Sequence, residues 1–448
     1  MRAKSASDAN DTPKSYARGA ALSTRAHEII PGGCHTYAKG DDQFPEAAPG
    51  FIVRGQGCHV WDVDGNEFIE YGMGLRAVSL GHAFRPVTDA VQRQLQFGAN
   101  FVRPAAIEVE AAEAFLGLIR GADMVKFTKD GSAALDGAVK LARAHTNRDM
   151  VAICGDHPFF SSSDWFIGTT GMPAGIPEWV RTHTVKFKYN SLASLEALFA
   201  EHPGKISCVV MEAAKAEEPA DGYLERVHAL CRAEGALFVL DEMITGFRWH
   251  MNGAQHLYGV TPDLSSFGKA LGNGFAVSAL AGKREFMQLG GVNHSHERVF
   301  LLSTTHGAET HALAAAIAVI KTYQSEPVIE TLYARGDQLR AGIAATVAEL
   351  KLEDHFTLGG RSSCLLYGTL DEQKRPSQPF RTLFLQETIR RGILAPSFAI
   401  SYSHSEADVR LTVDAVSEAL WVYRRALDEG VDRYLVGRPV KPVFRRFP

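Results

Sequence analysis

Asp241 and Lys269 form the pair of residues in this sequence that is best suited to chemistry. Asp241 lies in the segment VLDEMITGFR (239–248), directly after a short apolar run, and Lys269 lies in SSFGKALGNGF (265–275). Ligands of open α/β sheets bind beyond the carboxyl ends of the strands, so a carboxylate at such an end faces the binding crevice. A buried carboxylate there needs a cation or hydrogen-bond donors. The glycines beside Lys269 let a bulky group approach its amine.

A buried aspartate and a lysine in a crowded pocket suit pyridoxal 5'-phosphate. The aldehyde of this cofactor forms a Schiff base with a lysine amine. Its pyridine nitrogen works best when protonated, and an aspartate partner keeps it so. The alternative is an ordinary ion pair beside a glycine-rich turn, and the spacing alone does not separate the two.

A phosphate seat is predicted in KFTKDGSAALDGAVKLARAH (126–145), which reads as a strand, a turn and a long helix. Gly131 and Ser132 would bring free backbone N–H groups and a hydroxyl to the start of the helix, where anions bind. The alternative is an ordinary helix start with Ser132 as its N-cap.

The elements that must position these residues alternate between strands and helices. The runs 150–154, 207–212 and 236–242 predict strands buried on both faces, with helix patterns within 190–204 and 223–235 between them. This alternation indicates an α/β fold with a mostly parallel sheet wrapped by helices. Upstream, Cys58–Val63 and Glu67–Tyr71 flank Asp64-Gly65, which predicts a β-hairpin. The glycine- and proline-rich stretch from Ile29 to Gly57 predicts irregular structure.

The sequence resembles the class III aminotransferases of the fold-type I pyridoxal-phosphate enzymes, and within them the glutamate-1-semialdehyde aminomutase-like group. Several motifs together carry this resemblance, which runs from about Ile29 to the final helix. They are IPGG (30–33), VWDVDGNEFIEYGMGL (60–75), DGSAALDGAVKLARA (130–144), DEMITGFR (241–248), FGKALGNGF (267–275) and STTHGAETHALAAA (303–316).

The resemblance implies a role for each matching residue. Lys269 would bind the cofactor aldehyde and later move the proton at the substrate carbon, while Asp241 would pair with the ring nitrogen. Met243 would pack on one face of the ring, and Gly131 and Ser132 would hold the phosphate. Thr305 matches a threonine that reaches the phosphate of the neighbouring subunit, which implies a homodimer with shared active sites.

The chain also departs from the family pattern. The usual aromatic residue that stacks on the cofactor is replaced in GDHPFFSSSDWF (155–166), where Phe159, Phe160 or Trp165 remain as alternatives. The aminomutases carry a Phe-Glu-Ala segment near 395–409, and this chain has no glutamate between Pro396 and His404. We therefore expect transfer from an amino donor to a ketone or aldehyde acceptor. The alternatives are an aminomutase and a non-catalytic scaffold or regulator with this fold.

Substrate residues are predicted only as candidates. Arg76 follows a glycine-rich turn and would clamp a carboxylate or a phosphate, although a local salt bridge explains it equally well. The other candidate substrate residues are Tyr37, His35, His157, Arg248 and Tyr402.

The composition excludes several function classes. The 448 residues carry a formal net charge of −4, which gives no reason to bind nucleic acid or an anionic membrane. The polar N-terminus and the lack of a long apolar run predict a cytoplasmic protein with no membrane span. The six scattered cysteines predict free, mostly buried thiols. The histidines, including His294, His296, His306, His311 and His404, fit no recurrent spacing, so no metal site is expected.

The predicted domain organisation has four parts. Residues 1–28 form a polar N-terminal arm, and 29–85 the first part of a small domain. Residues 86–325 form the large cofactor-binding domain, and 326–448 complete the small α+β domain.

Overall fold

The computed structural model describes residues 14–157 and 161–447, which form two compact units. The first unit comprises residues 14–75, 81–83 and 330–443. The second comprises 76–80, 84–157, 161–329 and 444–447.

The second unit is built on a seven-stranded sheet with the strand order β4-β10-β9-β8-β7-β5-β6. Strands β6, β5, β7, β8 and β9 run parallel, whereas β10 is antiparallel to both β4 and β9. The strands are β4 (Met124–Thr128), β5 (Met150–Cys154), β6 (Thr184–Phe187), β7 (Ile206–Glu212), β8 (Leu237–Asp241), β9 (Leu264–Phe267) and β10 (Ser278–Gly282).

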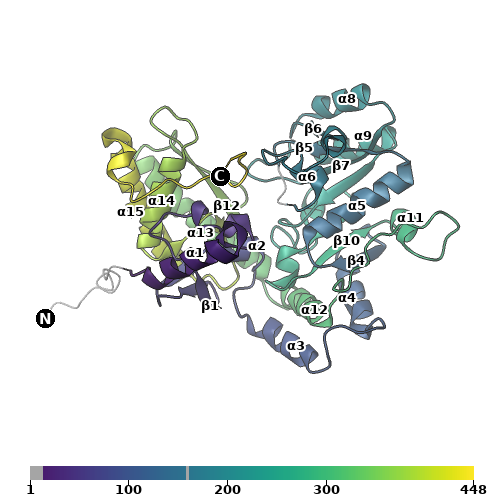
Figure 1. Ribbon diagram of the computed structural model, residues 1–448, viewed down its shortest axis with the longest axis horizontal. Coiled ribbons are helices and arrows are strands. Elements are labelled where there is room, and N and C mark those ends of the chain that lie inside the picture. Colours follow the sequence, from purple (N-terminus) through teal and green to yellow (C-terminus); the bar gives the residue numbers. More distant parts are fainter. Residues whose placement is uncertain (1–13, 158–160, 448) are drawn as a thin grey trace. The chain divides into compact units, whose positions relative to one another are not determined.

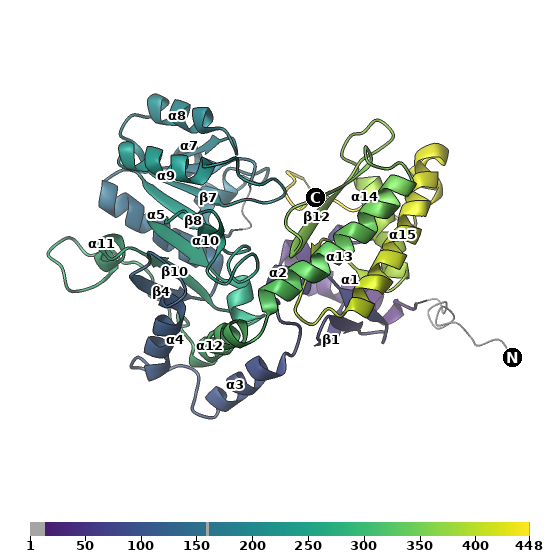
Figure 2. The ribbon, with the colours of Figure 1, turned by 180° about the vertical axis from the view of Figure 1, so that it is seen from behind.

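Helices cover both faces of this sheet, as Figures 1 and 2 show. Helix α5 packs its buried alanines and leucines with Val151, Val210 and Val239 on one face. Helices α8 and α9 cover the other face, where Ala152, Val209 and Leu240 point. The helices are α3 (Arg85–Leu95), α4 (Ala106–Leu116), α5 (Gly131–Thr146), α6 (Asp164–Ile167), α7 (Glu178–Thr182), α8 (Leu192–Glu201), α9 (Tyr223–Ala233), α10 (Ala254–Leu257), η5 (Lys269–Gly272), α11 (Arg284–Met287), η6 (Gln288–Gly290) and α12 (Thr310–Ser325).

The first unit combines two small sheets with long helices. One sheet has the order β1-β2-β3-β13, in which β13 adds in parallel to β3, and the other has the order β11-β12-β14. Its elements are α1 (Ala17–Ile29), η2 (Pro31–Gly33), η3 (Tyr37–Lys39), η4 (Asp41–Gln43), β1 (Ile52–Gln56), β2 (His59–Asp62), β3 (Glu67–Glu70), α2 (Met73–Arg76, ending in the second unit), α13 (Val328–Glu349, beginning there), β11 (Phe356–Gly359), β12 (Cys364–Thr369), α14 (Gln378–Arg390), β13 (Ile393–Leu394), β14 (Phe398–Ala399), α15 (Glu406–Glu429) and η7 (Val431–Arg433).

The predicted fold class is confirmed by the mostly parallel sheet between two helical layers. The predicted hairpin is also present, with Val60 paired to Phe68 in antiparallel register. The segment from Ile29 to Gly57 differs from the prediction, because it contains the strand β1, which pairs with β2 despite its glycine. Within the predicted N-terminal arm, helix α1 spans Ala17–Ile29, and the N–H groups of Arg18 and Gly19 donate hydrogen bonds to the carboxylate of Asp64.

The cysteines are free, and all except Cys34 are buried, as predicted. Within 14–157 and 161–447, no helix is long and apolar enough to cross a membrane.

Candidate active site

Lys269 stands at the turn that follows β9. Its backbone is in the left-handed region, with φ of 45°, a conformation that costs a side-chain-bearing residue roughly 1–2 kcal/mol. The turn is secured four residues later, where the Asn273 side-chain oxygen accepts hydrogen bonds from the N–H groups of Ser79 and Leu80 at 3.0 and 2.9 Å. Residues that pack tightly on this turn therefore hold the lysine in a strained conformation.

The amine of Lys269 lies in a dense and charged environment. Burial lowers the pKa of Lys269; Asp241 and Glu212 oppose this shift, whereas Arg76 and Lys215 add to it. Among the described residues, the amine makes neither a hydrogen bond nor an ion pair. A lysine in this setting loses its proton more readily than one at the surface, as a nucleophile or a base requires.

Asp241 is the last residue of β8, in the middle of the sheet, and only 3% of its surface is exposed. Its Oδ1 accepts hydrogen bonds from the Met243 N–H at 2.9 Å and from the Ser266 hydroxyl at 2.8 Å. Burial raises the pKa of Asp241, while Lys269 and these hydrogen bonds oppose the rise. The carboxylate is thus oriented by its own loop and by the neighbouring strand β9.

Glu212 lies beside Asp241, because the two residues are register partners at the ends of β7 and β8. Its Oε1 forms an ion pair with the Lys215 amine at 3.0 Å, and its buried Oε2 has no hydrogen-bond partner in the part of the chain that the structure describes. Burial raises the pKa of Glu212, and Lys215 opposes this rise. Lys215 could not be predicted from the sequence, since no spacing pattern joins it to Asp241; its ion pair with Glu212, the register partner of Asp241, brings it there.

The predicted phosphate seat lies at the start of α5, which begins at Gly131. Asp130 is the N-cap, and its Oδ1 accepts the Ala133 N–H at 2.9 Å, so the alternative with Ser132 as the cap is wrong. Aspartate is favoured at an N-cap position, where the backbone is extended and the side-chain oxygen can accept an N–H of the first helical turn. The Ser132 hydroxyl instead accepts the Ser162 N–H at 3.1 Å.

Met243 connects the two glycine-containing turns. A Cβ atom on Gly131 would lie 2.7 Å from the Met243 sulfur, and one on Gly268 would meet the same sulfur at 2.7 Å and the Ser278 hydroxyl at 2.5 Å. A side chain at either position would force Met243 to move, and at position 268 also the Ser278 hydroxyl, so the two glycines permit the close approach of this methionine. Asp241, Met243, Lys269 and the α5 turn consequently lie in one region of the second unit.

These residues fit pyridoxal phosphate. The α5 turn offers N–H groups and a hydroxyl to a phosphate. The buried carboxylate of Asp241 suits a ring nitrogen, and the amine of Lys269 suits an aldehyde. The buried Oε2 of Glu212, which has no hydrogen-bond partner among the described residues, is one acceptor that a further polar group could satisfy.

The remaining predicted site residues differ in position. His157 is buried in the second unit, where its ring packs on Tyr189 with the centroids 4.4 Å apart, and its Nδ1 has no hydrogen-bond partner within 14–157 and 161–447. Arg76 also belongs to the second unit, and its carbonyl accepts a hydrogen bond from the fully buried Arg248 at 3.1 Å. Tyr37, which is 59% exposed, and Tyr402 belong to the first unit.

Thr305 lies in an exposed segment before α12, and its carbonyl accepts a hydrogen bond from the Asn100 side chain at 2.8 Å. Of the aromatic alternatives, Phe159 and Phe160 lie outside the described residues. Trp165 is part of the core, and its indole N–H donates to Asp136 at 2.7 Å. Its ring is therefore committed to packing beneath α5.

Comparison with known proteins gives consistent matches over most of the chain. Residues 37–354 match the family model for aminotransferase class III. Glutamate-1-semialdehyde 2,1-aminomutase of Geotalea daltonii is 30% identical over 432 residues, covering 90% of this chain and 99% of that protein. The 3-aminobutyryl-CoA aminotransferase of Cloacimonas acidaminovorans is 30% identical over 422 residues, covering 92% and 98%.

Solved structures agree with these matches. The FumI protein of Sphingopyxis sp. MTA144, determined in a form containing pyridoxal phosphate, superposes with a TM-score of 0.85 at 27% identity, covering 95% of this chain and 99% of that one. An omega-transaminase from Sphaerobacter thermophilus gives a TM-score of 0.82 at 26% identity, covering 91% and 98%.

Proposed function

The chain belongs to the class III aminotransferases, which use pyridoxal phosphate, and we propose that Lys269 and Asp241 form its reactive centre. The observation that supports this assignment most strongly is the pair itself. A buried carboxylate ends β8 while a strained, half-buried lysine follows the adjacent strand β9. An ordinary ion pair would require no left-handed lysine and would bring the two groups into contact.

The cofactor, when bound, supplies an aldehyde that bonds to amines and a protonated ring that takes up negative charge from the substrate carbon. Asp241 would hold the proton on the ring nitrogen. Its orientation is set by the Met243 N–H and the Ser266 hydroxyl, which leave the carboxylate no freedom to turn away. Stabilisation by a fixed charge is effective here because burial excludes water.

Lys269 would hold the cofactor through its amine and then act as the base at the reacting carbon. A base must be neutral before it accepts a proton, and burial together with the nearby cations Arg76 and Lys215 favours the neutral amine. The strained backbone fixes where the amine can reach. The same residue would also return this proton when the amino group is transferred.

Gly131 and Ser132 would bind the phosphate through their N–H groups and the serine hydroxyl. Met243 would contribute an apolar surface against the ring, between the phosphate seat and the lysine turn. Thr305 would reach the phosphate of a second copy of the chain, so that the working enzyme is a homodimer with shared active sites.

The substrates would be a small amino donor and a carbonyl acceptor. Arg76 is close enough to Lys269 to lower the pKa of its amine, which supports a role in holding a carboxylate next to the reacting carbon. His157, Tyr37 and Tyr402 remain further candidates for substrate contacts.

An aminomutase is the second candidate, favoured by the 30% identity to the enzyme of Geotalea daltonii. Two incubations distinguish the reactions. Purified enzyme would be mixed first with single amino donors, and the cofactor spectrum would report conversion to the amine form. The same enzyme would then receive one amino aldehyde alone.

A transaminase converts its cofactor with a donor and recovers the aldehyde form with a separate acceptor. Isomerisation of the amino aldehyde without donor or acceptor would instead identify an aminomutase. A protein that neither changes colour with any donor nor isomerises the aldehyde would be a scaffold.

A further inference from the structure

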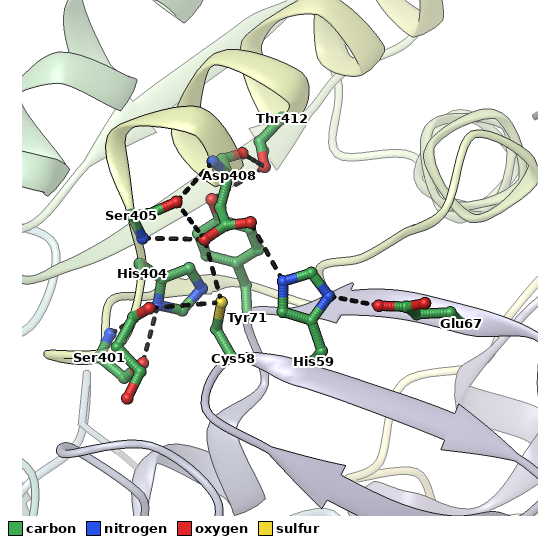
Figure 3. A network of polar contacts seen from close by, with 10 residues as sticks. Cys58, His59, Glu67, Tyr71, Ser401, His404, Ser405, Asp408 and Thr412 are labelled. Carbon is green, nitrogen blue, oxygen red and sulfur yellow. Dashed lines mark hydrogen bonds and ion pairs between the residues drawn. The ribbon is translucent and has the colours of Figure 1, made fainter. Parts of the chain in front are cut away.

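Three side chains of different chemistry meet in the first unit, where they are drawn in Figure 3. Cys58 and His59 lie at the start of β2, and Asp408 lies in the first turn of α15. One donor atom of each, a sulfur, a nitrogen and an oxygen, lies within 4.8 Å of the other two. Cys58 and Asp408 are buried, whereas the His59 side chain is 32% exposed.

The distances between the donor atoms suit a tetrahedral metal site. His59 Nε2 lies 3.1 Å from Asp408 Oδ1, and Cys58 Sγ lies 3.5 Å from Asp408 Oδ2. Zinc binds sulfur at about 2.3 Å and nitrogen or oxygen at about 2.0–2.2 Å, which separates neighbouring ligands of a tetrahedron by about 3.2–3.6 Å. These two contacts use different oxygens of Asp408, so the carboxylate must turn to place one oxygen on the same ion as the sulfur and the nitrogen, which all lie within 4.8 Å of one another.

A second layer of hydrogen bonds orients the ligands. On the side of the His59 ring facing away from Asp408, Nδ1 bonds to Glu67 Oε1 at 2.8 Å. Metal-binding histidines characteristically donate their other ring N–H to a carboxylate, which leaves Nε2 for the ion. Asp408 is held in turn by the N–H of Ser405 at 2.9 Å and by its hydroxyl at 2.6 Å.

We propose that Cys58, His59 and Asp408 bind one zinc ion, with water as the fourth ligand. A thiolate and an imidazole favour zinc over magnesium or calcium, which prefer all-oxygen sites. On binding, the thiol proton and the proton shared by His59 and Asp408 are released to solvent, and the two anionic ligands balance the charge of the ion. The ion ties the β2 strand to the start of α15, two segments that are 350 residues apart in sequence.

The test uses the cofactor-loaded enzyme, freed of metal by a chelator and titrated with cobalt(II) as a spectroscopic probe. We expect one equivalent to give the intense visible bands of a tetrahedral cobalt site, at wavelengths longer than the cofactor absorption. X-ray absorption of the zinc-loaded enzyme should show one sulfur in the first shell. Neither measurement depends on transaminase activity, so this proposal and the proposed function fail separately.

Variants assign the signal to this cluster. Cys58→Ser and His59→Gln should abolish the tetrahedral spectrum and the rise in melting temperature that zinc gives the unmodified enzyme. Cys364→Ser, which removes another buried thiol of the same unit, should retain both. The proposal is overturned if the unmodified enzyme binds no tetrahedral cobalt, if the zinc shell contains no sulfur, or if Cys58→Ser binds as the unmodified enzyme does. In those cases the cluster is a hydrogen-bond network held by protons alone.

Discussion

At the scale of single residues, the two reactive groups are fixed by different means. Asp241 is oriented by hydrogen bonds from Met243 and Ser266. Lys269 makes no polar contact with the described residues and is held by its backbone conformation. The carboxylate is thus held in a fixed orientation. The lysine side chain has no such restraint, so it can serve first in covalent bonding and then in proton transfer.

Asp241→Asn should separate cofactor binding from catalysis. The amide has nearly the same shape but cannot stabilise a protonated ring nitrogen, so we expect cofactor to be retained while kcat falls by about 100-fold or more. Steady-state kinetics and the cofactor absorbance measure both. Asp149→Asn changes an exposed aspartate and should have no effect. A near-normal kcat in Asp241→Asn would contradict the role of this carboxylate.

His157 should make the stability of the enzyme depend on pH. Burial, with help from Lys215, lowers the pKa of His157 to about 4 in the folded state, whereas the unfolded chain takes up the proton near 6.5. Between these values only the unfolded chain binds the proton. The free energy of unfolding is therefore highest above pH 6.5 and decreases as the pH falls towards 4. The linkage predicts a loss of about 2–3 kcal/mol by pH 4.5.

His157→Gln cannot titrate, and its free energy of unfolding should fall less between pH 7.5 and 4.5 than that of the unmodified enzyme. Urea unfolding at the two pH values measures the difference. Equal losses in both proteins would show that folding does not lower the pKa of His157.

The sequence identified the residue types of the proposed reactive centre, because a strand-end aspartate and a glycine-flanked lysine are local patterns. It could not identify Lys215 or the pairing of Glu212 with Asp241, which arise from the register of β7 and β8. It also left Trp165 open as a ring-stacking residue, although the structure commits its indole to Asp136. Contacts between distant segments are fixed by packing and have no local signal.

At the scale of elements, the buried strands were the most predictable. Strands β5, β7 and β8 are apolar on both faces and appear within one residue of their predicted bounds. Strand β1 was missed because only its pairing with β2 stabilises a segment that is mostly exposed. Helix α1 was missed for a similar reason, since its start is satisfied by Asp64, which is 45 residues away from Gly19.

Gly131→Ala tests the packing of α5 against the lysine turn. The added Cβ would lie 2.7 Å from the Met243 sulfur, so the methionine or the helix start must shift. Overpacking of this kind costs about 1–3 kcal/mol, and we expect the cofactor to bind roughly 10-fold more weakly. Equilibrium dialysis against pyridoxal phosphate measures this affinity.

Gly171→Ala is the matched control, because its nearest neighbour would be 3.8 Å from the new atom. Unchanged affinity in Gly131→Ala would mean that the phosphate does not bind at the start of α5.

At the scale of the whole molecule, distant parts of the chain combine within the first unit. Residues 14–75 and 330–443 share a sheet, because β13 extends β3 in parallel. The cluster of Cys58, His59 and Asp408 depends on the same union. The histidine and cysteine spacing therefore gave no sign of it, and the sequence predicted no metal site.

Thr305→Ala tests whether two copies of the chain share each active site. Loss of a hydrogen bond to a phosphate costs about 1.5–3 kcal/mol, so cofactor affinity should fall about 10-fold or more while sedimentation still gives a dimer. Thr304→Ala, one residue away, should bind cofactor normally. A fully active monomer, or normal affinity in Thr305→Ala, would exclude shared sites.

The role of Lys269 as the reactive group is tested most directly by the absorbance of Lys269→Ala. The unmodified enzyme should show the band of a cofactor bonded to lysine, which bleaches when an amino donor is added. Lys269→Ala should lack this band and all turnover, whereas Lys205→Ala, which changes an exposed lysine, should retain both. Turnover in Lys269→Ala comparable to that of the unmodified enzyme would contradict the assignment of this lysine as the reactive group.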